Sequence, residues 1–124
     1  WIYVEDHCEA LEILSRKGKN GESYNIGSGK NLRNIELTKL ILKIMKSKLK
    51  KIGKNVKIKF VKDRPGHDIR YALNSNEIFN SLKWKSTTNI KMGILKTIDW
   101  YLENLDYFKS LSKKHYVKRI GLKI

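Results

Sequence analysis

Three separate segments of this sequence repeat their apolar residues at the spacing of an α-helix, and this pattern restricts the possible folds most strongly. The segments cover residues 4–17, residues 89–104, and a stretch from Asn34 to a point before Gly53. Apolar residues three and four positions apart share one face of a helix, as in a helix that packs against a core. Gly18 fits a helix end, and Ser75 fits the cap of a further short helix through Leu82. We therefore expect four helices.

Two other segments favour extended structure. Residues 56–61 (VKIKFV) alternate apolar and basic side chains, which is the period of a half-buried strand. Residues 22–26 resemble a short strand that leads into the turn Gly27-Ser28-Gly29. Because the chain contains no internal repeat and no low-complexity linker, we predict one compact α+β unit.

The formal net charge of +15 permits an anionic partner, with nucleic acid as the first class to consider. Ten lysines lie between Lys39 and Lys62 with no acidic residue among them. However, 22 of the 27 basic residues are lysine, whereas base edges and phosphates are recognised mainly by arginine. We interpret the lysines as a solvated face, and nucleic-acid binding as the alternative.

The remaining composition places the chain in a broad class. Cys8 is the only cysteine, so no internal disulfide is possible and the cytoplasm is the expected compartment. The sequence shows no signal peptide and no apolar run long enough to cross a bilayer. The first residue is Trp1 within an apolar run, and we expect the sequence to be a segment of a longer protein.

The most informative loop runs from Asp63 to Asp68 and contains the only proline of the chain. Pro65 and Gly66 favour a tight turn from which Arg64 and His67 project to one side. A guanidinium offers a planar fork of donors that suits a diphosphate. An ordinary surface turn with internal ion pairs explains the residues equally well, so both readings stay open.

Two further positions have a structural and a functional interpretation. Asn34 precedes the lysine-rich helix, so it is either an N-cap or an amide that holds a phosphate or sugar oxygen. The turn Gly27-Ser28-Gly29 lacks the third glycine and the acidic partner of a dinucleotide-binding fingerprint, which leaves a structural turn. His7, Cys8 and the other histidines do not follow a metal-ligand spacing, so we expect no metal site.

Four motifs, taken together and in order, resemble the dTDP-glucose 4,6-dehydratases, a family of extended short-chain dehydrogenases/reductases. Residues 1–7 (WIYVEDH) resemble the W-[LI]-Y-V-E-D-H segment of that family, and residues 22–27 (ESYNIG) its E-x-Y-N-I-G stretch. Residues 63–72 (DRPGHDIRYA) match its D-R-P-G-H-D-x-R-Y-A signature, and residues 97–102 (TIDWYL) its T-[VI]-x-W-Y-L ending. The resemblance covers about residues 1–105.

The resemblance implies a C-terminal substrate-binding lobe without its Rossmann half. We expect a nucleotide-sugar-binding part at residues 1–105 and a basic tail at residues 106–124. The intact enzyme of such a family uses NAD to convert dTDP-glucose to dTDP-4-keto-6-deoxyglucose by internal redox and loss of water, and it is a homodimer. The NAD-binding and catalytic residues belong to the other half, so the resemblance implies a chain that is inactive alone.

Four substrate-binding residues carry over from the family: Asn34, Arg64, His67 and Tyr116. Arg64 and His67 match the residues that hold the diphosphate, and Asn34 matches an asparagine at a helix start. The family has glycine where this chain has Lys83, and aspartate in place of Asn74; both differences concern local turns. A related sugar-nucleotide epimerase, decarboxylase or dehydratase is the alternative within the same superfamily.

Overall fold

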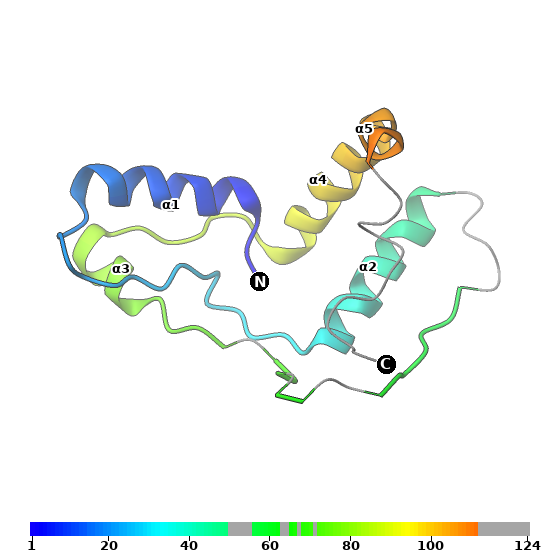
Figure 1. Ribbon diagram of the computed structural model, residues 1–124, viewed down its shortest axis with the longest axis horizontal. Helices are drawn as coiled ribbons and strands as arrows, with labels where there is room; N and C mark the ends of the chain where they lie inside the picture. The colour runs from blue at the N-terminus through cyan, green and yellow to red at the C-terminus, as the bar shows by residue number, and fades with distance from the viewer. Residues whose placement is uncertain (50–55, 63–64, 67, 71, 112–124) are drawn as a thin grey trace.

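A computed structural model describes residues 1–49, 56–62, 65–66, 68–70 and 72–111. Figure 1 shows the five helices of this part: α1 (Val4–Lys17), α2 (Asn34–Lys48), α3 (Asn76–Leu82), α4 (Ile90–Glu103) and α5 (Leu105–Ser110). The first four confirm the helices predicted from the sequence. None of the described helices is both long and apolar enough to cross a membrane.

The main core lies between α1 and α3, which run side by side in Figure 1. Ala10 of α1 and Ile78 of α3 are fully buried, and Trp84 just after α3 is 5% exposed. A small alanine side chain lets the two helices approach closely, while the indole ring fills the space beside them. Ile2, Ile13, Leu14, Tyr24, Ile26 and Leu82 pack around this centre.

The second contact joins α2 to α4. Leu37 and Ile44 of α2 and Ile98 of α4 are buried, as their positions on the predicted apolar faces require. Lys48 and Asp99 form an ion pair between the same two helices. Because α2 is fixed in this way, its first turn has a defined position relative to the rest of the chain.

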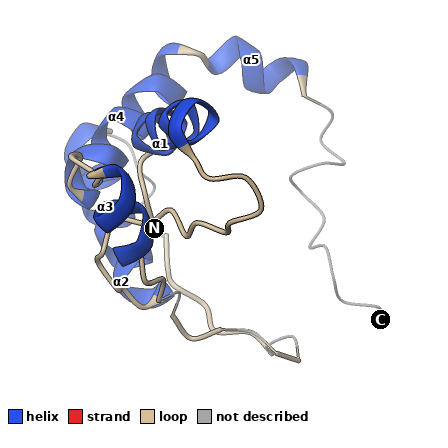
Figure 2. Cartoon of the chain, turned by 90° about the vertical axis from the view of Figure 1, so that its left-hand side faces the viewer, coloured by secondary structure: helices blue, strands red, loops and turns tan. Residues whose placement is uncertain are grey.

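The expected strands are not found in the described part of the chain. Residues 22–26 and 56–62 are neither helix nor strand, and Figure 2 accordingly shows helices and loops alone. A strand exists only when a second strand pairs with it, and the one pairing in the described residues is an isolated antiparallel bridge between Arg33 and Arg70. The predicted α+β class is therefore correct for its helices, and its strands are corrected to unpaired segments.

Candidate functional site

The site begins at the amino end of α2, where Arg33 is the N-cap with extended backbone angles of φ −69° and ψ 150°. Glu36, three residues later, accepts the Arg33 main-chain N–H at 2.8 Å through Oε2 and contacts the Arg33 guanidinium at 3.2 Å through Oε1. A guanidinium has only donors, so the reciprocal half of a capping box is impossible here. The hydrogen bonds from the Arg33 main chain and side chain hold the pKa of Glu36 below its usual value.

Asn34 is the first residue inside α2, so its predicted role as the N-cap is wrong. Arg33 occupies the cap because Glu36 follows it at the spacing that satisfies its N–H. The Asn34 side chain instead donates from Nδ2 to the Asp68 carbonyl oxygen at 3.2 Å, and its main-chain N–H donates to the Ile69 carbonyl oxygen at 3.4 Å. Both bonds attach the start of α2 to the segment 68–70.

The amide of Asn34 keeps one unused group. Its Oδ1 atom is buried and has no hydrogen-bond partner among the residues that the structure describes. One N–H of Nδ2 donates to the Asp68 carbonyl oxygen, and the unpartnered Oδ1 atom is an acceptor. The group suits a hydroxyl or N–H of a ligand and does not suit a phosphate oxygen, which has no hydrogen to donate.

The structure confirms the turn that the sequence predicts at Pro65 and Gly66. Gly66 has φ +71°, a conformation that residues with a Cβ atom rarely adopt. The three other predicted site residues, Arg64, His67 and Tyr116, lie outside the described residues. The turn at residues 65–66 and the Asn34 contacts to Asp68 and Ile69 are next to Arg64 and His67 in the sequence alone.

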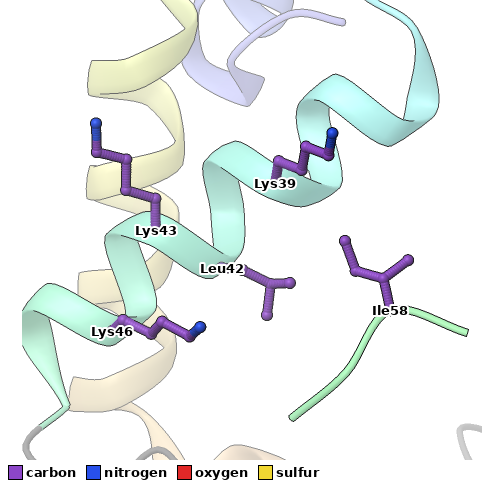
Figure 3. Close-up of a pocket in the computed structure, with 5 residues that line it drawn as sticks. All are labelled: Lys39, Leu42, Lys43, Lys46 and Ile58. Carbon is purple, nitrogen blue, oxygen red and sulfur yellow. The ribbon is translucent and has the colours of Figure 1, made fainter.

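A separate cavity of about 370 Å³ lies on the lysine-rich side of α2. Figure 3 shows Leu42 and Ile58 pointing toward one another, with Lys39, Lys43 and Lys46 spread around them. The ammonium groups do not converge on one point in this view. This arrangement fits the solvated lysine face predicted from the sequence better than a site for a compact anion.

The glycine turn offers little space. A cavity of about 10 Å³ lies beside Gly27, Ser28 and Gly29, which is room for about one water molecule. A Cβ atom added to Gly27 would lie 3.0 Å from the Ser75 hydroxyl and 3.5 Å from the Leu73 side chain. Gly27 therefore serves close packing, and the turn does not fit a dinucleotide.

Sequence reasoning missed a buried carboxylate at Asp6, which lies in the first turn of the predicted helix at residues 4–17. Asp6 is 4% exposed, and it accepts hydrogen bonds from the Ser86 hydroxyl at 2.6 Å and from the Thr88 hydroxyl and main-chain N–H at 2.7 and 2.9 Å. Burial alone raises the pKa of Asp6, but these donors outweigh it and the pKa lies below the usual value. Asp6 thus ties α1 to the segment that leads into α4.

Comparison with known proteins places the chain in a family. A sequence model described as GDP-mannose 4,6-dehydratase matches residues 1–97, most of the chain. The chain belongs to this family. This match agrees with the four sequence motifs, which predict a relationship to the sugar-nucleotide dehydratases.

The individual relatives carry a related name. A probable dTDP-glucose 4,6-dehydratase of Sinorhizobium fredii is 41% identical over 98% of this chain and 35% of its own length. The dTDP-glucose 4,6-dehydratase of Escherichia coli is 38% identical over the same shares. The chain thus spans about a third of the length of these relatives. The predicted resemblance to the dTDP-glucose 4,6-dehydratases is confirmed.

A solved structure agrees with the fold. The dTDP-glucose 4,6-dehydratase of Bacillus anthracis, determined in complex with NAD, superimposes with a TM-score of 0.74 at 34% identity. The match covers 90% of this chain and 33% of that enzyme. The helical arrangement described above is therefore that of one part of a larger dehydratase structure.

Proposed function

We propose that this chain anchors the sugar nucleotide in a dTDP-glucose 4,6-dehydratase, as the substrate-binding lobe of a longer, homodimeric, cytoplasmic enzyme. The observation that carries the proposal is the attachment of the first turn of α2 to the loop after Pro65 and Gly66. Asn34 makes this attachment through its side chain and its main chain. It brings Asn34, a substrate-binding residue carried over from the family, next to the motif at residues 63–72.

The division of labour within this site follows from its chemistry. Asn34 presents the acceptor Oδ1, which suits a sugar or ribose hydroxyl, or a base N–H. Arg64 and His67 supply donors from the adjacent loop for the diphosphate. Contacts to these remote groups position the sugar for reaction, and such binding energy contributes to the rate even where no bond is broken.

The described residues do not fit NAD. The glycine turn lacks the fingerprint of a dinucleotide site, and the cavity beside it is about 10 Å³. We therefore derive no redox step from this chain, and we place NAD binding, the hydride transfers and the loss of water in the rest of the enzyme. On this proposal the 124-residue chain binds substrate and does not turn it over.

Titration calorimetry with dTDP-glucose tests the proposal. Wild-type chain should bind it, and Arg64→Ala should weaken binding by roughly 10-fold or more, because a charge-assisted contact is worth about 1.5–3 kcal/mol. Arg16→Ala is the matched control, since Arg16 lies on α1 and pairs with Glu12. Equal binding by wild type and Arg64→Ala contradicts the proposal.

The base preference needs a second comparison, because the matching family model is described by GDP-mannose and the relatives by dTDP-glucose. GDP-mannose and dTDP-glucose carry the same diphosphate but different bases and sugars. If GDP-mannose binds at least 10-fold more tightly than dTDP-glucose, the chain serves the alternative sugar-nucleotide dehydratase. We expect the opposite order.

A further inference from the structure

Two arginines are paired through their main chains at the point where α2 joins the loop. Arg33 and Arg70 form the isolated antiparallel bridge, and the nearby Asn34 N–H donates to the Ile69 carbonyl oxygen at 3.4 Å. That bond flanks the arginine pair rather than joining it, so the pair occupies the non-hydrogen-bonded position of the bridge. Opposed residues are closest at this position, with Cα atoms about 4.5 Å apart, and their side chains leave the same face.

Only one of the two positive charges has an anionic partner in the described chain. Glu36 contacts the Arg33 guanidinium at 3.2 Å, whereas no described acidic residue forms an ion pair with Arg70. Both arginines are exposed, and the amino end of α2 adds a further partial positive charge. Like charges directly opposite each other destabilise a pairing, so a bound anion should stabilise the pairing of Arg33 with Arg70.

The arrangement contrasts with other cations of the chain. Arg16 pairs with Glu12 at 2.6 Å on α1, and Lys48 pairs with Asp99 across α2 and α4. Lys39, Lys43 and Lys46 are flexible single-point donors that spread apart in Figure 3. The main chains of the two arginines, in contrast, are paired. Each guanidinium is a planar fork that can bind two oxygens of one phosphoryl group.

We propose that Arg33 and Arg70 form a two-arginine clamp for a phosphoryl group of the ligand. The clamp rests on the proposed function in one respect, namely that the phosphoryl group belongs to a sugar nucleotide. Whatever the ligand, the group that the clamp binds is a phosphoryl anion. It adds two residues to the predicted set of Asn34, Arg64, His67 and Tyr116. Glu36 competes with the ligand for Arg33, so the clamp closes fully when the anion displaces this contact.

Calorimetric binding of inorganic pyrophosphate and of dTDP-glucose tests the clamp in Arg33→Gln, Arg70→Gln and Arg70→Lys. Each glutamine variant should weaken pyrophosphate binding about 5-fold, the upper range for one exposed charge contact. Arg70→Lys keeps the charge without the fork and should recover part of the loss. Glu36→Gln should tighten binding, because it removes the competing carboxylate but keeps an oxygen for the Arg33 N–H.

Arg16→Gln is the matched control, since it removes the same charge from α1. Unchanged pyrophosphate binding in both Arg33→Gln and Arg70→Gln, or an equal loss in Arg16→Gln, overturns the clamp. Circular dichroism of each variant identifies any loss of helix; if one glutamine variant does not fold, the other decides.

The two proposals fail in different ways. If pyrophosphate binding depends on the arginines but dTDP-glucose does not bind, the clamp stands and the proposed function fails. If dTDP-glucose binds equally well to wild type and to both glutamine variants, the proposed function stands and the clamp fails.

Discussion

Replacing Asp6 by asparagine should destabilise the chain far more than an ordinary change on α1. Asp6 is almost fully buried, and its carboxylate accepts hydrogen bonds from the Ser86 hydroxyl, the Thr88 hydroxyl and the Thr88 main-chain N–H. Asparagine keeps one acceptor oxygen but has an NH₂ group in place of the second carboxylate oxygen. Asp6→Asn therefore loses the charged acceptor that these hydrogen bonds share, and its NH₂ group can no longer accept from the donors that it faces.

The magnitude follows from these contacts. A hydrogen bond to a charged group contributes about 1.5–3 kcal/mol and one between neutral groups about 0.5–1.5 kcal/mol, so each of these hydrogen bonds loses about 1–2 kcal/mol. Water entry and local relaxation reduce the sum, so we expect a loss of about 3 kcal/mol in the free energy of unfolding at pH 7. For a chain of this size such a loss is a large share of the total stability, which is typically about 5–15 kcal/mol.

Urea unfolding followed by circular dichroism measures this loss. Glu9→Gln is the matched control, because it makes the same chemical change at an exposed position of α1 and should change stability by less than about 0.5 kcal/mol. If Asp6→Asn loses less than about 1 kcal/mol relative to Glu9→Gln, the hydrogen bonds do not anchor α1 as described.

The pH dependence gives a second readout of the same group. Folding lowers the pKa of Asp6, so the folded chain binds this proton less readily than the unfolded chain. The stabilisation is complete above the unfolded pKa, for which the usual value is 3.8, and it is lost as the pH falls through the lower folded pKa. The stability difference between wild type and Asp6→Asn should therefore stay constant from pH 7 to about 5 and shrink below pH 4. A difference that grows on acidification contradicts this.

Three further changes test the fold that positions the site. Lys83 has φ +56°, so Lys83→Gly should stabilise the chain by about 1 kcal/mol in urea unfolding, while Lys83→Ala, which keeps the strain, should not. Ile78→Ala should lower the free energy of unfolding by about 2–5 kcal/mol, because it leaves a cavity in the core. If Phe79→Ala, at a half-exposed neighbouring position, lowers it by as much, the assigned core is wrong. Asn89 accepts the Met92 N–H at 3.0 Å, so Asn89→Ala should lower the midpoint of thermal unfolding through a loss of about 1 kcal/mol, and an unchanged midpoint refutes the cap.

The sequence predicted the helices well because each helix is specified by its own residues. The predicted segment 89–104 became α4 with Asn89 and Asn104 as its caps, and Leu37 and Ile44 are buried on α2 as their spacing requires. Tyr101 follows the buried Ile98 by three positions, at the spacing of one helix face, yet it is 45% exposed. Periodicity identifies a face, but the packed neighbours decide how much of that face is covered.

The strands and the side-chain contacts of the site depend on residues far apart in the sequence. Residues 56–61 have a strand pattern, but no pattern within the segment supplies the partner that a strand requires. Asp6 looks like a helix-start residue until Ser86 and Thr88, about eighty positions later, meet it. For the same reason the sequence left Asn34 open between a cap and a ligand-binding amide: its contacts are with Asp68 and Ile69, which local sequence cannot reveal.

A titration of ¹⁵N-labelled chain with dTDP-glucose, followed by NMR, tests the central claim most directly. We predict that the largest shift changes fall on the Asn34 side-chain amide and on the main-chain amides of Ile69 and Arg70, at the attachment of α2 to the loop. Changes confined to the lysine face around Lys43 and Lys46, or spread evenly over the helices, would contradict a sugar-nucleotide site at the amino end of α2.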